Sequence, residues 1–289
     1  MNYRHQFHAG NFADVVKHYL LLRVLHALQR KDKGLLYLDT HAGRGTYDLA
    51  RAAHGDTLER QPEWPAGIGR LWSAPNLPAG LQDYIGLVRT YDRQQGNLEA
   101  APRFYPGSPR LVSGLLRPQD RMALCERQPD ECQALRAALG RTPRCLIREE
   151  DGYQALRALL PPPERRALVL IDPPYESQRE FDDIVNAVEA GLRRLPGGTF
   201  LIWYPLTLRA RVDEFFDRLQ TLELPPTAVA ELAVAGEDSA LKLRGCGLVV
   251  LNPPWQLADE ITPVLGLLAG LLAQGTGADG SWRWLVPER

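Results

Sequence analysis

The hydrophobic positions near the start of the chain follow a helical spacing. Between residues 11 and 34 apolar side chains recur three and four positions apart, which predicts one amphipathic helix. Asn11 stands before the first of them with Asp14 three residues later, close to a capping box, and Gly34 is expected to end the helix. The next residues, 35–39, form a short apolar run that ends in Asp39, and this pattern predicts a buried strand.

Further short apolar runs follow at intervals, and amphipathic segments separate them. The runs predict strands at 122–126, 145–147, 167–172 and 199–204, and the segments predict helices at 129–139, 153–160, 181–195 and 208–222. Strands that alternate with helices indicate a mostly parallel sheet covered on both faces. Residues 229–234 and 247–251 flank a polar stretch and predict a hairpin, with an antiparallel strand at the end of the sheet. A short helix is expected over 263–273.

One interval between predicted strands is too long for this alternation of strands and helices. From Asp39 to Met122 the chain is far longer than a strand–helix–strand unit of about 30 residues needs. The excess, residues 46–104, is rich in Pro, Trp and Arg and contains a helical apolar stripe, so we interpret it as a small helical insertion. Ser108 and Pro109 are expected to start the crossover helix as its N-cap and first residue. The whole chain, 1–289, is expected to be a single domain.

Composition excludes several classes of protein. Hydrophobic residues make up 45% of the 289 and charged residues 24%, which excludes a disordered or fibrous chain. No apolar run is long enough to span a bilayer and the first residues show no secretory signal, so no membrane partner and a cytoplasmic location are expected. The four cysteines lack zinc spacing, which predicts no metal site. A monomer is expected.

Charge is informative through its distribution. The net charge of -1 argues against binding of nucleic acid over the whole protein surface. The first 34 residues carry six basic and two acidic side chains, a local +4, which is either an anion-binding footprint or a solvated helix face. On charge alone the solvated face is favoured.

The polar residues that follow the predicted strands are the candidate chemistry, because ligands of open α/β sheets bind beyond the carboxyl ends of the strands. After Asp39 comes a glycine turn, 41–45, which lacks G-x-G-x-x-G and so disfavours a nicotinamide site. Glu126 is placed to accept two ribose hydroxyls, as in NAD and S-adenosylmethionine sites, or is an exposed strand-end carboxylate. Asp151 and Gly152 either line the same site or only cap the next helix.

The strongest motif is Asp172-Pro173-Pro174-Tyr175, directly after the most apolar strand. The two prolines stiffen the backbone and remove N–H donors, so a carboxylate and a carbonyl remain as acceptors for the two N–H groups of an exocyclic amine. Tyr175 offers a face on which a base can stack, although a stiffened corner with a packed tyrosine is the structural alternative. A similar run, 252–255, is interpreted as a turn, because too little chain follows it to build the rest of a sheet.

These residues resemble a known family. The Asp-Pro-Pro-Tyr motif is similar to that of amino-methyltransferases that use S-adenosylmethionine. Together with it, four further segments resemble the bacterial 23S ribosomal RNA adenine-N6 methyltransferase family RlmJ over essentially the whole chain: Tyr3-Arg4-His5 with Phe7-His8-Ala9-Gly10-Asn11, Ala13-Asp14-Val15 and Lys17-His18; Tyr37-Leu38-Asp39-Thr40-His41-Ala42-Gly43; Tyr105-Pro106-Gly107-Ser108-Pro109; and Trp203-Tyr204-Pro205.

The resemblance implies a Rossmann-like class I methyltransferase fold with a mostly parallel seven-stranded sheet, a terminal antiparallel strand and the helical insertion. It implies S-adenosylmethionine as cofactor and 23S ribosomal RNA as partner. Asp172 would be the catalytic acceptor and Tyr3 would touch the substrate. The implied cofactor-binding residues are His18, His41, Ser108, Glu126, Asp151, Gly152 and Asp172.

The mechanism we expect is that Asp172 and the Pro173 carbonyl accept the two N6 hydrogens of an unstacked adenine while Tyr175 stacks on its ring. A DNA adenine-N6 methyltransferase is the nearest alternative, but the chain has no separate target-recognition domain. A protein-glutamine methyltransferase usually has Asn in place of Asp172. A non-catalytic RNA-binding module and a nicotinamide oxidoreductase are the remaining alternatives. A purely structural role is the simpler interpretation for four of these residues: His18, His41, Ser108 and Tyr3.

Overall fold

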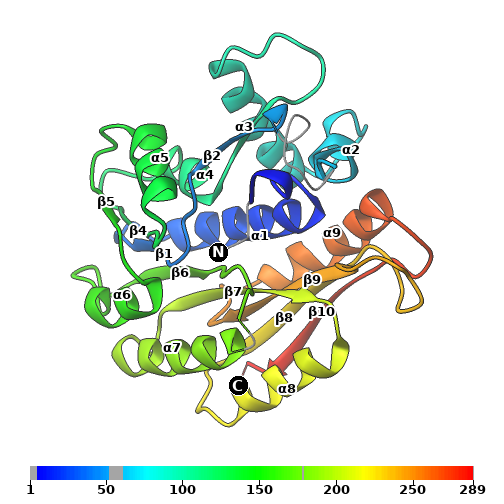
Figure 1. Ribbon diagram of the computed structural model, residues 1–289. Helices are drawn as coiled ribbons and strands as arrows, with labels where there is room; N and C mark the ends of the chain where they lie inside the picture. Colours follow the sequence, from blue (N-terminus) through cyan, green and yellow to red (C-terminus); the bar gives the residue numbers. More distant parts are fainter. Residues whose placement is uncertain (1–4, 52–60, 178, 289) are drawn as a thin grey trace.

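A mixed sheet with helices on both faces forms the body of the protein (Figure 1). The computed structural model describes residues 5–51, 61–177 and 179–288. The sheet has eight strands in the order β10-β8-β9-β7-β6-β1-β4-β5. Their bounds are β1 (Leu36–Asp39), β4 (Arg121–Cys125), β5 (Cys145–Arg148), β6 (Ala167–Ile171), β7 (Thr199–Leu206), β8 (Thr227–Ala233), β9 (Gly245–Leu251) and β10 (Asp279–Val286).

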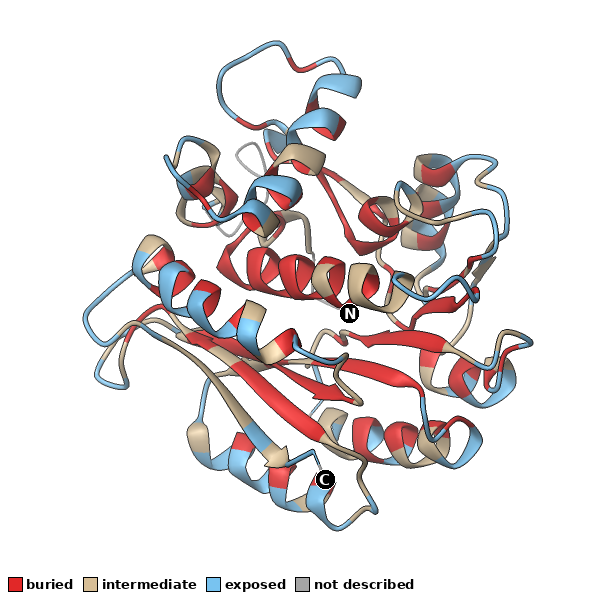
Figure 2. Cartoon of the chain, turned by 180° about the vertical axis from the view of Figure 1, so that it is seen from behind, coloured by how far each residue is buried: buried red, intermediate tan, exposed pale blue. Residues whose placement is uncertain are grey.

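The strands are buried on both faces because their side chains alternate between two cores. In β1, Tyr37 enters one core while Leu36 and Leu38 enter the other. The first core lies under α1 (Phe12–Gln29), α4 (Ser108–Ser113), α5 (Pro129–Leu139) and α9 (Leu257–Leu272). The second lies under α6 (Gly152–Leu159), α7 (Glu180–Arg194) and α8 (Arg209–Gln220). Figure 2 shows the buried sheet between these layers.

The prediction of a mostly parallel α/β sheet is confirmed, but the number of strands is eight and not seven. β9 runs antiparallel between β7 and β8, so the predicted hairpin does not provide the edge of the sheet. The edge is β10, which pairs antiparallel with β8. Gly280 permits this, because a Cβ there would lie 2.3 Å from the carbonyl oxygen of Leu265 in α9.

The order in which strands are added to the sheet reverses at β1. From β1 the sheet first grows through β4 to β5 on one side, and the chain then returns to place β6 and β7 on the other side of β1. β1, β4, β5, β6 and β7 are parallel, so their carboxyl ends meet at one edge. Such a switch point opens a crevice for ligands. Asp39 and Asp172 stand on its two sides.

Two predicted helix bounds were wrong, and for the first of them the reason lies far away in the sequence. Helix α1 begins after Asn11, as predicted, but ends at Gln29 and not at Gly34. Arg117 donates to the carbonyls of Gln29 and Lys31, and Arg166 donates to Leu28, so two arginines satisfy the carbonyls of its last turn. Helix α9 starts at Leu257, six residues before the predicted start, and holds Pro263 inside it.

The residues of the expected insertion form their own small group of elements. Strand β2 (Thr46–Asp48) pairs with β3 (Phe104–Pro106), so the two ends of the segment lie side by side. Between them are η3 (Trp64–Ala66), α2 (Ile68–Trp72) and α3 (Ala79–Gln94), and α3 packs against α1. A further short helix, η1 (His5–Phe7), precedes α1. Among the described residues, no helix combines the length and the apolar character needed to cross a membrane.

Candidate active site

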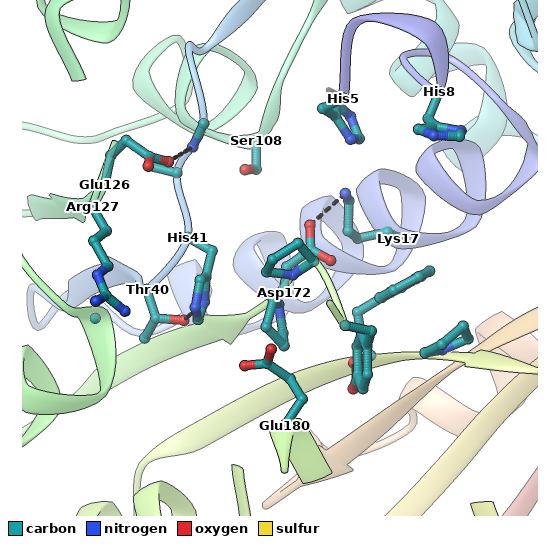
Figure 3. A pocket seen from close by; sticks show the side chains of 18 of the residues that line it. His5, His8, Lys17, Thr40, His41, Ser108, Glu126, Arg127, Asp172 and Glu180 are labelled. Atoms are coloured by element: carbon teal, nitrogen blue, oxygen red, sulfur yellow. Dashed lines mark hydrogen bonds and ion pairs between the residues drawn. The ribbon is translucent and has the colours of Figure 1, made fainter. Parts of the chain in front are cut away.

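A cavity of about 1580 Å³ lies along the carboxyl ends of the parallel strands. Figure 3 shows Glu126 and Arg127 toward one end, Asp172 and Lys17 toward the other, and His41 and Ser108 between them. Tyr3, expected to touch the substrate, lies outside the described residues. The structure brings all the other predicted site residues to this cavity: His18, His41, Ser108, Glu126, Asp151, Gly152, Asp172, Pro173 and Tyr175.

The carboxylate of Asp172 has a buried cation as its partner. The ammonium of Lys17, on α1, lies 2.6 Å from Oδ2 of Asp172 and 2.8 Å from Oδ1 of Asp14. Burial disfavours the charged amine, but the two carboxylates outweigh it, and the pKa of Lys17 is raised well above its ordinary value. Lys17 therefore stays charged and neutralises part of the negative charge at the site.

Sequence reasoning missed Lys17, Asp14 and His5 as site residues. Nε2 of His5 donates to Asp14 over 3.1 Å, and all three side chains line the cavity. The signal in the sequence is the spacing of Asp14 and Lys17, which puts them on one face of a helix. That spacing does not reveal that the face meets Asp172, which is 155 residues away from Lys17.

A further carboxylate, Asp39, is fully buried at the end of β1, next to the cavity residues His41 and Ser108. Its Oδ2 accepts from the hydroxyls of Tyr37 at 2.8 Å and Ser108 at 2.7 Å, and its Oδ1 accepts from the amide of His41 at 3.2 Å. Burial raises the pKa of Asp39 to about 6, against the opposing effect of these hydrogen bonds. Ser108 is the first residue of α4 and Gly107 is its N-cap, so the prediction of Ser108 as the cap was wrong.

Replacing Asp39 with asparagine is expected to remove one contribution to the pH dependence of stability, so that the free energy of unfolding of the wild type falls relative to that of the variant between about pH 4 and pH 6. In that window the folded wild type keeps a proton on Asp39 that the unfolded chain releases at the ordinary aspartate pKa of 3.8, so this contribution falls as pH rises and is constant above pH 6. Over roughly two pH units the fall amounts to about 3 kcal/mol. Urea unfolding at several pH values measures it, with Asp213→Asn as an exposed control. Parallel curves for wild type and the Asp39 variant would contradict the assignment.

Two histidines of the cavity, the buried His18 and the half-buried His41, are neutral. Burial lowers the pKa of His18 to about 3 and that of His41 to about 4. Nδ1 of His18 lies 2.7 Å from the hydroxyl of Tyr105. Thr40 gives its one hydroxyl hydrogen to the carbonyl of Leu170, so it accepts from Nδ1–H of His41 at 2.8 Å. The other ring nitrogen of His41 is then a hydrogen-bond acceptor.

Glu126 and Asp151 are both fixed by backbone N–H groups. Glu126 accepts from Gly43 at 2.9 Å and from Gln128 at 2.7 Å, one hydrogen bond to each oxygen. Burial raises the pKa of Glu126. Asp151 caps α6, and its Oδ1 accepts from Tyr153 at 2.8 Å. The capping interpretation of Asp151 is therefore confirmed, and its carboxylate lines the cavity as well.

Gly152 allows α6 to approach the loop after β1. A Cβ on Gly152 would lie 2.0 Å from the carbonyl oxygen of Thr40, so no other residue fits without a shift of the backbone. This contact draws the first turn of α6 against the Thr40–His41 segment. The side chain of His41 then meets Tyr153, and their ring centroids are 5.0 Å apart.

Tyr175 forms the apolar side of the cavity beside Asp172. Its hydroxyl donates to the carbonyl of Trp203 at 2.6 Å, and its ring packs against Phe181 and Trp203 at 5.0 and 5.6 Å between centroids. The backbone of Tyr175 has a φ of +53°, a conformation that is uncommon for residues other than glycine and that is found at functional sites. The turn holds the ring in one orientation beside the carboxylate.

The second Pro-Pro motif lies at the opposite end of the sheet, as expected for a structural turn. It follows β9, which runs antiparallel to β7, so Leu251 pairs with Phe200 near the start of β7. The amide of Asn252 donates to the carbonyls of Pro196 and Gly198, both at 2.8 Å. Asn252 therefore closes a loop and does not line the cavity.

Comparison with known proteins agrees with this architecture. The family model described as ribosomal RNA large subunit methyltransferase D, RlmJ, matches residues 32–286. Proteins named ribosomal RNA large subunit methyltransferase J from Escherichia coli (strain K12) and Haemophilus influenzae are each 39% identical, and the match covers all of both chains. A crystal structure from Legionella pneumophila is 35% identical with a TM-score of 0.84, and the match covers 98% of this chain and 99% of that one. The chain therefore belongs to the RlmJ family of large-subunit ribosomal RNA methyltransferases.

Proposed function

We propose that the protein transfers a methyl group from S-adenosylmethionine to the N6 amine of one adenine in 23S ribosomal RNA. The observation that carries the proposal is Asp172-Pro173-Pro174-Tyr175 at the switch point of the sheet, in one cavity with Glu126 and Asp151. The family relatives, which are named ribosomal RNA methyltransferases, support RNA over DNA as the substrate.

The donor set of the cavity fits the cofactor. Glu126 is held by two backbone amides, and its oxygens keep lone pairs that can accept from a ribose diol. The neutral imidazoles of His18 and His41 add no positive charge beside a cationic ligand. When bound, S-adenosylmethionine supplies an electrophilic methyl group on a positively charged sulfur. Ser108, Asp151 and Gly152 are the other residues that we propose hold it.

The size of the cavity supports two ligands at once. Pockets for a single small ligand usually measure about 300–1,000 Å³, and this one measures about 1580 Å³. The space beyond Asp172 is bounded by Tyr175, Trp203 and Phe181. We propose that this space receives an adenine that has left the RNA stack.

We propose that Asp172 and the Pro173 carbonyl accept the two N6 hydrogens of that adenine. Because the two acceptors take up both hydrogens, the nitrogen lone pair is left for bond formation. A carboxylate is too weak a base to deprotonate a neutral aromatic amine, so Asp172 acts first as a hydrogen-bond acceptor. The methyl group would leave its bonding electron pair on the sulfur of the donor. The methylated nitrogen is then cationic, and a proton passes from it to Asp172.

Replacing Tyr175 with alanine is expected to lower kcat/KM for RNA about 5- to 150-fold, because stacking on an aromatic ring contributes about 1–3 kcal/mol per base. Trp255→Ala is the matched control. It removes the aromatic residue of the second Pro-Pro motif, is 73% exposed, and lies at the other end of the sheet, so it should leave the rate unchanged. Equal rates for the two variants would contradict the role of Tyr175.

The function is tested by incubating the protein, S-adenosylmethionine and unmodified 23S rRNA and then identifying the modified nucleoside. N6-methyladenosine at a single position is expected. Transfer to duplex DNA but not to RNA would favour the DNA methyltransferase instead. Failure to bind S-adenosylmethionine in calorimetry would favour a non-catalytic RNA-binding module. We further propose that the protein is a monomer in the cytoplasm. Light scattering of the purified protein measures its mass and so tests whether it is a monomer.

A further inference from the structure

Asp14 is a buried carboxylate that lies behind Lys17 and has no direct contact with Asp172. It sits in the first turn of α1, where its backbone amide donates to the side chain of Asn11 at 2.9 Å. Only 2% of Asp14 is exposed. The helix start therefore fixes the backbone from which this carboxylate projects.

The two oxygens of Asp14 have different partners. Oδ2 accepts from the amide of Gly10 at 2.9 Å and from Nε2 of His5 at 3.1 Å. Gly10 has a φ of +74°, which places its amide in a turn that other residues rarely adopt. Oδ1 is 2.8 Å from the ammonium of Lys17. One oxygen is thus anchored by the N-terminal turn, and the other holds the lysine.

Lys17 is shared between two carboxylates because of this arrangement. Its ammonium is 2.6 Å from Oδ2 of Asp172, one of the two oxygens of the carboxylate that the proposed mechanism needs as an acceptor. While Asp14 takes part of the positive charge, Asp172 keeps the capacity to bind an amine hydrogen. Without the charge on Asp14, the ammonium would turn fully toward Asp172 and compete with the substrate for that oxygen.

We propose that Asp14 is a positioning residue for methyl transfer, which acts on the reaction through Lys17. The inference rests on the proposed function, because it assigns a role within the same site. Asp14 touches no reacting atom. Its effect on the rate should therefore exist only while Lys17 is present.

A double-mutant cycle tests this dependence. Asp14→Asn is expected to lower kcat about 100-fold, the size that misplacement of a catalytic group can reach, and to leave the Kd for S-adenosylhomocysteine within threefold. Asp14→Asn added to Lys17→Met should cost no further rate, because the residue through which Asp14 acts is already gone. Rates that multiply, or a wild-type kcat for Asp14→Asn, would overturn the proposal.

Asp92→Asn is the matched control. Asp92 is also 2% exposed and accepts from backbone amides of Arg103 and Phe104, but it lies outside the cavity, so its loss should lower stability and not kcat. If Asp14→Asn does not fold, Asp14→Glu keeps the charge and shifts the carboxylate by one methylene. It should still lose at least tenfold in kcat, and a wild-type rate would overturn the proposal.

An NMR titration of the Lys17 ammonium separates this inference from the proposed function, since it needs no reaction. The chain has four lysines, so Lys17→Met assigns the signal. Asp14 and Asp172 raise the pKa of Lys17, and His5 and His18 are the other titratable groups that face Asp14. The pKa of Lys17 should fall in Asp14→Asn. If the pKa of Lys17 is unchanged in Asp14→Asn, the inference is overturned even if the wild type methylates RNA. If the pKa falls in Asp14→Asn but the wild type does not methylate RNA, only the proposed function is overturned.

Discussion

Replacing Asp172 with asparagine is expected to lower kcat about 1,000-fold. The variant keeps the size of the side chain but loses the charge, presents an NH₂ group toward the amine, and removes the final proton acceptor. General acid–base groups contribute about 10²–10⁴-fold to rates, so the middle of that range is a fair expectation. Single-turnover transfer of labelled methyl groups to 23S rRNA measures it.

The expected loss is in chemistry and not in ligand binding. S-adenosylhomocysteine should still bind Asp172→Asn in calorimetry, because Glu126 and Asp151 remain in place. Asp213→Asn makes the same chemical change at an exposed carboxylate on α8 and should turn over normally. A rate for Asp172→Asn within threefold of wild type would remove the basis of the proposed mechanism.

Replacing Lys17 with methionine is expected to lower the free energy of unfolding by about 3–5 kcal/mol, since it leaves buried carboxylates without their cation. Lys17 and Asp14 have side-chain exposures of 6% and 2%, so water screens this pair poorly. Methyl transfer should fall as well, because Asp172 loses its partner. Urea unfolding at neutral pH measures the stability.

Lys31 provides the control for that measurement. It is a lysine in the same N-terminal region, but it is exposed, so Lys31→Met should change stability by no more than about 0.5 kcal/mol. A Lys17→Met protein as stable as the Lys31→Met protein would show that the ion pairs to Asp14 and Asp172 contribute little to folding.

Much of the fold could be predicted because it depends on local patterns. Apolar runs bounded by polar residues gave the parallel strands, and the helix at 129–139 matches α5 at both ends. The end of α1 and the edge of the sheet were predicted wrongly because distant residues decide them. The end of α1 depends on Arg117 and Arg166, and the edge strand β10 depends on β8 and on the close approach that Gly280 permits.

The candidate site shows the same division. Residues at strand ends could be predicted to converge, because parallel strands place their carboxyl ends together, and Asp172, Glu126 and Asp151 do line one cavity. Lys17 comes from a helix that packs on the face of the sheet. Nothing in its local sequence tells which strand end it reaches, so its pairing with Asp172 needed the structure.

The reversal of β9 bears on how such enzymes are recognised. Two runs of the form polar–Pro–Pro–aromatic occur in this chain, and each follows an apolar strand. Since β6 and β9 point in opposite directions, one run opens into the cavity and the other lies on the far edge. A motif search that uses only the residue types gives both runs the same score. A search that also includes the direction of the preceding strand in the sheet separates the run at the reaction centre from the one that forms a structural turn.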